Sequence, residues 1–348
     1  IAIRGFGSIN AGTSPLIIVD GAPYDGGWNN LNPNDVESIT VLKDAASNAL
    51  YGARGANGVI MITTKKGKSE DAVVTLDAKW GVNSLATQEY DIITDPGQYY
   101  EMYYKALYNY NVRDNGLSAY DAHVTANSTL GKPASQGGLG YIVYSVPENE
   151  YLIGTNGRIN PHATLGNRVY NNGKFYTLMP DDWIDEAFRK SLRQEYNLSL
   201  TGGSGKMNFY GSLGYLNNKG IAYNSDFERY SARFKTDYQA KEWLKVGASL
   251  SYTHTNQNDV NDGDNLFTMV SGLAPIYPVY IRDDNGDIMT DENGKLYDYG
   301  SGENGGAKRP ANLLPARNPL QANELNKNAT VANITTLNSY ADFTPIDG

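Results

Sequence analysis

The sequence predicts a small α+β domain followed by part of an antiparallel transmembrane β-barrel. Three observations lead to this fold class. Residues 15–68 combine short apolar runs with helix-start and glycine signals, which is typical of a compact mixed unit. Later segments alternate apolar and polar residues, as strands with two unlike faces do. The connections between these segments are short and long in turn, which favours an outer-membrane barrel over a β-sandwich.

The α+β unit begins with a strand. Residues 16–19 form an apolar run that ends at Asp20-Gly21, a turn signal. Residues 32–38 begin with Asn-Pro-Asn-Asp, which favours a single helical turn, and residues 39–42 are again β-rich. These segments predict two strands joined through one turn of helix.

A second short helix and a last strand complete the unit. Asp44 can cap a helix over residues 45–51. Gly55 and Gly58 then precede a strand over residues 59–64. The order is helix, glycines and strand, the reverse of the order in a phosphate-binding loop. The glycines therefore indicate turns and close backbone packing rather than a nucleotide site.

Six later segments each have one largely apolar and one largely polar face. In residues 244–254, for example, most even positions are apolar and most odd positions are polar. The pattern recurs, more weakly in the last case, in residues 72–82, 192–201, 207–216, 230–240 and 337–343. We expect six strands. Six cannot close a wide barrel, and a barrel that holds a folded domain has about 22, so further strands are expected beyond Gly348.

The connections distinguish the two ends of these strands. The sequence predicts tight turns at residues 202–206 and 239–243. It predicts long loops at residues of about 84–190 and 256–334. Aromatic residues on the apolar faces are mostly near strand ends, as in an interfacial girdle: Trp80, Tyr196, Tyr215, Tyr230, Tyr238 and Tyr252. Ligand recognition is expected in the long loops.

Within the long loops the sequence predicts little regular structure. Asp95-Pro96 begins a helix that runs to about Tyr110, whereas residues 116–172 show no periodicity and are expected to be irregular. Residues 283–287 and 291–295 carry acidic side chains beside Asn-Gly. Their spacing does not fit an EF-hand calcium loop, so surface hairpins are the better interpretation.

Composition excludes several classes of function. The net charge of −9 comes with no basic stripe, so no nucleic-acid partner is expected. The chain has no cysteine, and His123, His162 and His254 are isolated, so neither a metal site nor a catalytic constellation is indicated. The serines lack the G-x-S-x-G context of a nucleophile elbow. We expect no enzyme activity, no cofactor and no metal.

Residues 1–68 also carry a series of ordered motifs. These are IRG, IIVDG, NPNDVESI, VLKDA, YGARGANGVI and TTKKG. In this order they closely resemble the plug domain of the SusC/RagA-like TonB-dependent outer-membrane transporters. The resemblance implies a plug domain at residues 1–70, in its C-terminal part only, and the first six barrel strands with their extracellular loops at residues 71–348.

The resemblance also implies a function. Relatives import bulky nutrients across the outer membrane of Gram-negative, Bacteroidetes-type bacteria, energised by TonB from the inner membrane. A SusD-like surface lipoprotein closes over the barrel, which is itself surrounded by outer-membrane lipid. The expected cargo is an oligosaccharide. The alternatives are a peptide importer of the same family and a lone TonB-dependent receptor of the siderophore or cobalamin type.

Particular residues take roles by the same resemblance. Arg4 matches a plug arginine that pairs with barrel glutamates, expected beyond Gly348, and Lys65 or Lys66 is expected to act similarly. The remaining plug signature consists of Asp20, Gly21, Glu37, Asp44, Tyr51, Gly52, Arg54, Gly55 and Gly58. Tyr24 and Trp28, in the glycine-rich segment after Asp20-Gly21, are the expected substrate contacts.

Overall fold

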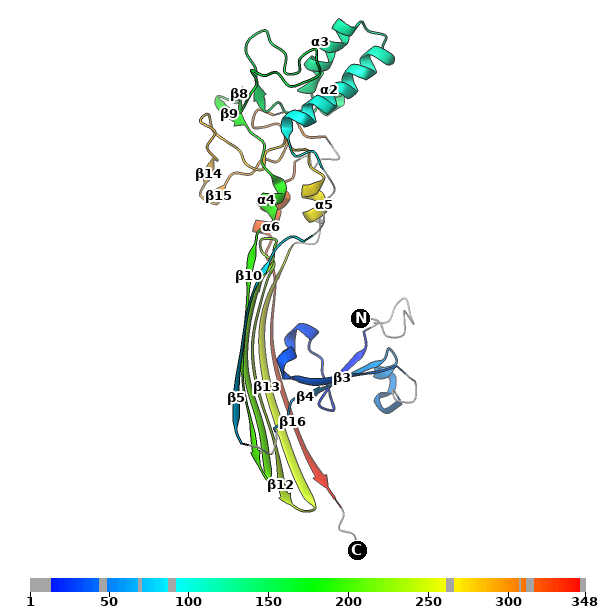
Figure 1. Ribbon diagram of the computed structural model, residues 1–348, viewed down its shortest axis with the longest axis vertical. Coiled ribbons are helices and arrows are strands. Elements are labelled where there is room, and N and C mark those ends of the chain that lie inside the picture. Colours follow the sequence, from blue (N-terminus) through cyan, green and yellow to red (C-terminus); the bar gives the residue numbers. More distant parts are fainter. Residues whose placement is uncertain are drawn as a thin grey trace.

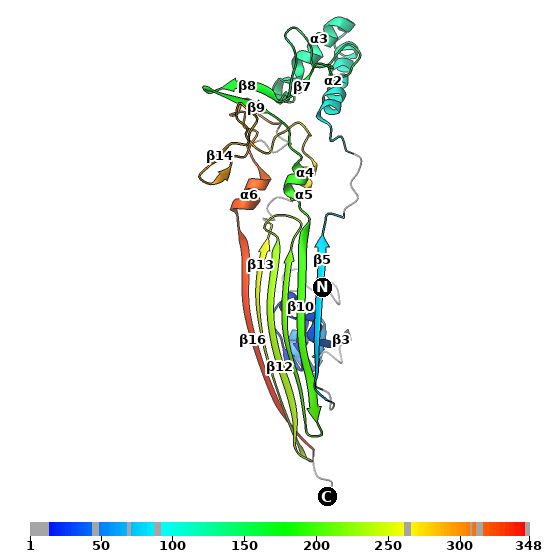
Figure 2. The ribbon, with the colours of Figure 1, turned by 60° about the vertical axis from the view of Figure 1, so that its left-hand side comes forward.

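The chain folds into two sheets and a group of long loops. The computed structural model describes residues 14–43, 49–67, 71–86, 92–260, 266–306, 308–310 and 316–344. A small four-stranded sheet lies on the concave side of a tall, curved six-stranded sheet (Figures 1 and 2). The long loops gather beyond one end of the tall sheet, and its short turns lie at the other end.

The small sheet has the strand order β2-β1-β4-β3. Its strands and short helical turns are β1 (Leu16–Val19), β2 (Ala22–Pro23), η1 (Trp28–Asn30), η2 (Pro33–Asp35), β3 (Val36–Leu42), η3 (Ala49–Gly55) and β4 (Val59–Thr64). β4 pairs with β1 in parallel and with β3 in the antiparallel direction. The predicted strands at residues 16–19, 39–42 and 59–64 are therefore confirmed. The predicted helix at residues 45–51 lies largely outside the described residues.

The tall sheet is antiparallel throughout, with the order β16-β13-β12-β11-β10-β5. The strands are β5 (Val73–Asn83), β10 (Ser191–Ser204), β11 (Met207–Lys219), β12 (Asp226–Lys241), β13 (Leu244–Asp259) and β16 (Asn328–Phe343). All six predicted strands are present. Several extend further toward the loops than the alternation indicates, because backbone pairing continues where both faces are polar.

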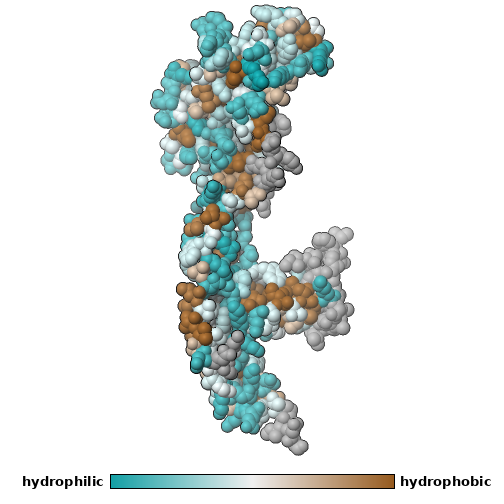
Figure 3. Space-filling model, viewed as in Figure 1, coloured by the Kyte–Doolittle hydropathy of each residue, from teal (hydrophilic) through white to brown (hydrophobic). Residues whose placement is uncertain are grey.

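The two faces of the tall sheet differ in polarity. The convex face exposes large apolar side chains, and Figure 3 shows hydrophobic residues along its edge. Leu76, Val82 and Leu337 on this face are 68, 69 and 72% exposed. The concave face is polar and partly covered by the small sheet. It buries Glu195, Asn197 and Arg229 among others.

Aromatic rings form a row across the convex face. Trp80 lies 5.7 Å from Tyr196, Tyr196 lies 6.3 Å from Tyr215, and Tyr215 lies 4.9 Å from Tyr230, centroid to centroid. Tyr238 lies eight residues further along β12, near the short turns. At about 3.3 Å per residue this separates the two aromatic levels by ~26 Å along the strand.

The first long loop is more regular than the sequence predicts. The expected helix is confirmed as α2 (Pro96–Arg113), with the Asp95 side chain accepting a hydrogen bond from the Gln98 amide. The expectation of irregular structure over residues 116–172 is wrong. This segment contains α3 (Ala119–Leu130), η4 (Ala134–Gln136), β6 (Tyr144–Ser145), β7 (Thr164–Leu165) and β8 (Asn167–Asn171), which pairs with β9 (Lys174–Leu178).

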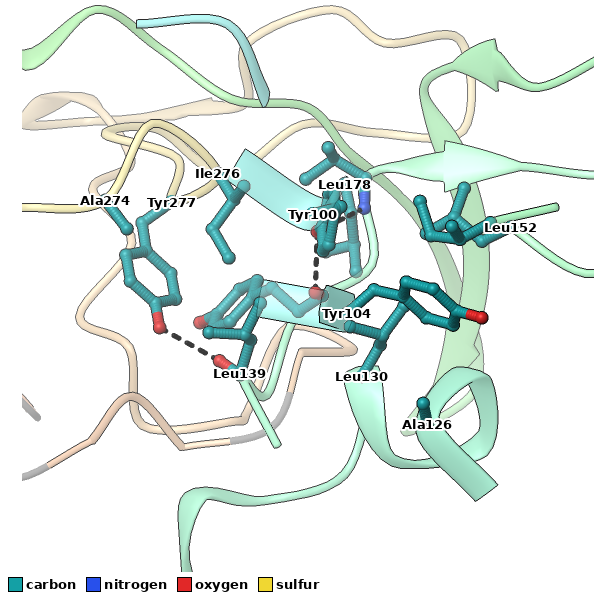
Figure 4. Packing of buried hydrophobic residues seen from close by; sticks show 13 residues of the cluster. Tyr100, Tyr104, Ala126, Leu130, Leu139, Leu152, Leu178, Ala274, Ile276 and Tyr277 are labelled. Carbon is teal, nitrogen blue, oxygen red and sulfur yellow. Dashed lines mark hydrogen bonds between the residues drawn. The ribbon is translucent and has the colours of Figure 1, made fainter. Parts of the chain in front are cut away.

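The loops have an apolar core of their own. Figure 4 shows Tyr100 and Tyr104 of α2 packed against Leu130 of α3 and Tyr277 of the second long loop. A second cluster joins α4 (Trp183–Ala187), α5 (Leu266–Ser271) and α6 (Pro319–Leu325) just above the strands. Tertiary packing therefore holds the long loops in one arrangement.

The acidic segment of the second loop forms a surface hairpin, as expected. Its strands are β14 (Thr290–Asp291) and β15 (Gly294–Lys295). The described residues contain no cluster of three or more metal-ligating side chains. None of the helices described is both long and apolar enough to cross a membrane.

Candidate functional site at the interface of the plug and the tall sheet

One edge of the small sheet meets the polar face of the tall sheet. The turn after β1 and the segment around η1 and η2 supply the contacts, and β10 to β13 receive them. The residue pairs joined by side-chain hydrogen bonds include Asn34 with Glu195, Asp35 with Tyr210, and Asn30 with Thr255. Segments about 160 to 225 residues apart in sequence thus form one polar interface.

Asp20 is the centre of a buried ion cluster. Its carboxylate accepts hydrogen bonds from the amide and hydroxyl of Thr64 at 2.9 and 2.5 Å. Arg233 Nη2 lies 2.6 Å from one carboxylate oxygen, and Lys235 Nζ lies 3.1 Å from the other. The Asp20, Arg233 and Lys235 side chains are 9, 7 and 14% exposed. One acid of the small sheet therefore binds two bases of β12.

The surroundings of Asp20 lower the pKa of its carboxyl group. Burial alone would raise this pKa, because it penalises the charged form. The hydrogen bonds from Thr64 and the positive charges of Lys235 and Arg233 together outweigh burial. Asp20 is therefore an anion near neutral pH, and the cluster has an excess of positive charge.

A second cluster surrounds Arg229 of β12. Its Nη1 donates to the carbonyl oxygens of Asn29 and Leu31 at 3.2 and 2.8 Å. The Asn32 side chain caps η2 and also donates to Asn197 Oδ1 and Ser231 Oγ at 2.9 and 3.2 Å. Arg229 thus satisfies backbone carbonyls of the small sheet, while Asn32 fixes η2 to two strands.

Two glycines permit this close approach. A Cβ added to Gly214 of β11 would lie 2.5 Å from both Asn32 Nδ2 and Ser231 Oγ. A Cβ added to Gly67 would lie 2.3 Å from the Phe209 amide nitrogen. Both distances are far below van der Waals contact. A side chain at Gly67 would meet the backbone of Phe209 and push this segment away from β11, and one at Gly214 would displace the hydrogen-bonded side chains of Asn32 and Ser231.

The residues expected to pair with the barrel, and Asp20, Gly21 and Asp44 of the plug signature, lie in different places. Asp20 lies in the interface, followed by Gly21 at φ 87°. Arg4 and Asp44 lie outside the described residues. Lys65 and Lys66 are exposed, and no ion pair joins either to another described residue.

The other signature residues lie within the small sheet or on its surface. Arg54 forms an exposed ion pair with Asp25 at 2.8 Å, Glu37 is exposed on β3, and the Tyr51 hydroxyl is 3.9 Å from Met61 Sδ. The conformations of the glycines suit their predicted roles in turns. Gly52 and Gly58 have positive φ values of 57° and 97°, and Gly55 is buried.

The two expected substrate contacts differ in access. Tyr24 is 9% exposed and packs with Val19, Ile60 and Ile62, and burial raises the pKa of its hydroxyl. Trp28 is 37% exposed. It lines an open groove of about 400 Å³ together with residues of η1 and of the loop-side ends of the strands. In this conformation only Trp28 of the pair is open to a ligand.

The residues of the tall sheet that hold the plug were not predicted individually. Arg229, Arg233 and Lys235 share one property that the sequence does show. They are basic residues at odd positions in and just before the segment 230–240, on its polar face, with Ser231 between the first two. Basic residues on a barrel's inner face indicate an acidic partner there.

Comparisons with known proteins agree with this geometry. Residues 1–59 match the TonB-dependent Receptor Plug Domain family. The chain is 27% identical to the TonB-dependent receptor SusC of Bacteroides thetaiotaomicron, over 99% of this chain and 29% of SusC. It is also 27% identical to the TonB-dependent receptor P39 of Formosa agariphila, over 79% of this chain and 21% of P39.

Solved structures give the same result over the whole chain. The RagAB peptide transporter aligns with a TM-score of 0.63 and 26% identity, over 100% of this chain and 35% of that chain. The RagAB peptide importer in its closed-closed state aligns with a TM-score of 0.63 and 28% identity, over 34% of that chain. The chain spans about a third or less of these relatives. It is a SusC/RagA-like TonB-dependent receptor sequence that comprises a plug domain and antiparallel strands of the receptor barrel.

Proposed function

We propose that the intact protein is a TonB-dependent importer of a bulky nutrient across the outer membrane. The observation that carries this proposal is a folded domain bound by buried charges to the polar face of strands whose other face is apolar. A barrel with this polarity spans a membrane, and a domain on its inner face blocks the path through it. Import then requires that the domain move or rearrange.

The interface suits a domain that moves. The described contacts across it are mainly hydrogen bonds and ion pairs, with Ile334 packing on the apolar core of the small sheet. Water can replace polar contacts when the domain shifts, whereas apolar surface would cost about 25 cal/mol per Å² exposed. The outer membrane has no ATP, so TonB supplies the work by pulling on the segment that precedes the small sheet.

The cargo we propose is an oligosaccharide, delivered beneath a SusD-like lipoprotein. The groove beside Trp28 opens between the plug and the loop-side ends of the strands, where a ligand that entered through the loops would arrive. An indole ring suits the stacking of a sugar face. A peptide is the second candidate, because the aligned RagAB structures are described as a peptide transporter and importer. A lone siderophore-type or cobalamin-type receptor is the third.

Residue roles follow from this function. We propose that residues 1–70 form the plug and residues 71–348 the barrel portion, with Trp28 as the substrate contact. Arg4 and Lys65 or Lys66 are proposed to pair with glutamates of the later barrel. Asp20 adds an anchor of opposite polarity, in which the plug supplies the acid and the barrel the bases.

Purification and uptake experiments test the proposal together. The intact protein is purified from its native outer membrane in mild detergent, and co-purifying proteins are identified. Uptake of labelled oligosaccharides and peptides is then compared in cells with and without TonB. A stoichiometric lipoprotein and TonB-dependent oligosaccharide uptake would support the proposal, and peptide uptake would favour the second candidate. Uptake that is independent of TonB would contradict it.

A further inference from the structure

The loops contain a cavity that the transport mechanism does not use. It has a volume of about 460 Å³, within the range of roughly 300–1,000 Å³ for small-molecule sites. α4, α6 and the β14–β15 hairpin surround it, above the tall sheet on the side away from the small sheet (Figures 1 and 2). Its lining includes Glu186, Tyr280, Lys295, Tyr297 and Glu324.

Two carboxylates and two aromatic rings line this cavity. The Tyr280 hydroxyl donates to Glu186 Oε2 at 2.7 Å, and the Tyr297 hydroxyl donates to Glu324 Oε2. The two rings are 5.2 Å apart, centroid to centroid. Burial raises the pKa of the Tyr297 hydroxyl, and the negative charges of Glu324 and Glu186 raise it further. Both carboxylates therefore lie close to the Tyr297 hydroxyl.

The two carboxylates outnumber the one basic side chain that lines the cavity in the described part of the chain, Lys295. Across the described part of the chain, neither Glu186 nor Glu324 forms an ion pair. Each carboxylate retains lone pairs beyond the one that accepts the tyrosine hydroxyl. The cavity therefore has a local negative charge that a ligand can satisfy.

A cation already occupies part of the cavity wall. Lys295 Nζ lies over the Tyr280 ring, 4.3 Å from its centroid. The aromatic face thus accommodates an ammonium group, as such faces do for cations within about 6 Å. Lys295 belongs to a short, exposed hairpin and can swing away at little cost. It occupies the place that an ammonium ligand would prefer.

We propose that this cavity binds the ammonium or guanidinium group of an organic cation, held by Glu186 and Glu324 against the exposed face of the tyrosine pair. Lys295 is an intramolecular competitor that lowers the affinity. Metal ions fit less well, because the described residues here supply only two carboxylates, each already bound to a tyrosine hydroxyl. The site is separate from the interface between the plug and the tall sheet, since it lies among the loops beyond the end of the strands.

The test uses the full-length protein in detergent and titration calorimetry with N-acetyl-lysine methylamide. The neutral N-acetyl-norleucine methylamide and maltose serve as comparison ligands. We expect binding of the lysine compound alone, weakened about tenfold or more by Glu186→Gln or Glu324→Gln. Glu148→Gln, an exposed carboxylate on another loop segment, should leave it unchanged.

The Lys295→Met variant is expected to gain affinity, whereas a misfolded protein would lose it. Removal of the resident ammonium should raise the affinity for the lysine compound several-fold. Equal binding of the norleucine compound, binding of maltose at the same place, or no change in Lys295→Met would overturn the proposal. Because the readout is binding and not uptake, the result is separate from the outcome for transport.

Discussion

Asp20 has an unusual backbone conformation, and its carboxylate pairs with two basic side chains. Its φ of 49° is in the left-handed region, which aspartate and asparagine tolerate better than most residues. Gly21 continues the turn at φ 87° and directs the Asp20 carboxylate toward Thr64 and β12. The turn therefore positions a single acid opposite two bases, Arg233 and Lys235, in a region that excludes most water.

The Asp20→Asn variant tests this anchor. Asparagine fits the same turn, so the change removes the charge and leaves Arg233 and Lys235 buried without their counter-ion. Loss of one partner of a buried pair costs about 3–5 kcal/mol. Amide exchange at Thr64 should therefore accelerate by roughly 100-fold or more, as measured by hydrogen–deuterium exchange on the intact protein.

Asp25→Asn is the matched control. It breaks the ion pair between Arg54 and Asp25, whose side chains are 60 and 84% exposed, and should change exchange little because exposed pairs contribute under about 1 kcal/mol. Equal protection of Thr64 in the wild-type and Asp20→Asn proteins would show that this charge does not hold the plug.

Acidification should act on the same residue. Because the pKa of Asp20 is lowered in the folded protein, its stabilising contribution is complete above the ordinary value of 3.8 and is lost as the pH falls through the lower, folded pKa. Protection of the Thr64 amide should therefore decline below pH 3.8 in the wild-type protein. The Asp20→Asn protein should lack this contribution to the decline. Identical pH profiles would refute the linkage.

At the scale of elements, α2 organises the first long loop through one tyrosine. Tyr100 is fully buried, donates to the Tyr141 carbonyl at 2.7 Å and accepts from the Val143 amide at 3.2 Å (Figure 4). The hydroxyl thus satisfies two backbone groups of a segment that has no strand partner there. Apolar packing of the ring and these two bonds together fix the loop to α2.

Tyr100→Phe should weaken the attachment of this loop to α2, while the phenylalanine ring still fills the apolar core. The change leaves a buried carbonyl and a buried amide unpaired, at a cost of about 1–3 kcal/mol. Exchange of the Val143 amide should increase by roughly 5- to 100-fold. Tyr110→Phe on the same helix, at a site 56% exposed, should have no such effect. If both variants exchange alike, the Tyr100 hydroxyl is not what fixes the loop.

Whether an element could be predicted depended on how strongly its faces differ. The six strands were predicted because apolar residues of the convex face alternate with polar residues of the concave face, as in residues 244–254. The loop-side end of β13 was missed because both of its faces are polar there, and that of β16 because Val331 and Ile334 lie on opposite faces and give no alternation. α3 was missed because the residues that it buries, Ala122, His123, Ala126 and Leu130, include a single large apolar side chain and so give a weak helical pattern. The side chain of Ser118, which caps α3, was the available signal.

At the scale of the whole molecule, the convex face forms an apolar band between two aromatic levels. The row from Trp80 to Tyr230 marks the loop side, and Tyr238 with the stacked pair Trp243 and Phe343 marks the turn side. With strands tilted about 35–45°, a separation of ~26 Å along the strand corresponds to a height of ~20 Å. This approaches the ~25 Å band of outer-membrane barrels.

An arginine in the middle of this band should be poorly tolerated. Leu250 is 49% exposed on the convex face, midway between the two aromatic levels. Leu250→Arg should destabilise the intact protein in lipid by about 2–4 kcal/mol, measured by unfolding from bilayer vesicles. Leu325→Arg, in α6 among the loops and 66% exposed, should cost about 0.5 kcal/mol or less. Equal costs would place Leu250 outside the lipid.

The candidate site was only partly predictable, because its halves come from distant parts of the chain. Asp20 was recognised as part of a turn and of a family motif. Its partner Arg233 lies 213 residues away, and their contact depends on the register of four strands and on how the small sheet is seated. The strand pairing predicted from the sequence does not show the contact between Asp20 and Arg233. The polar face of residues 230–240 was visible, but the acid that it meets was not.

The central claim is that the plug must move against the tall sheet for cargo to enter. In the intact protein without other cysteines, Asn29→Cys with Gln257→Cys allows a reducible bis-methanethiosulfonate reagent to link plug and sheet, because the two native side chains meet there at 3.4 Å. Asn83→Cys with Asn218→Cys, linked within the tall sheet, is the control. We predict that TonB-dependent uptake stops in the first variant only and returns on reduction. Full uptake with the plug quantitatively linked would contradict the account.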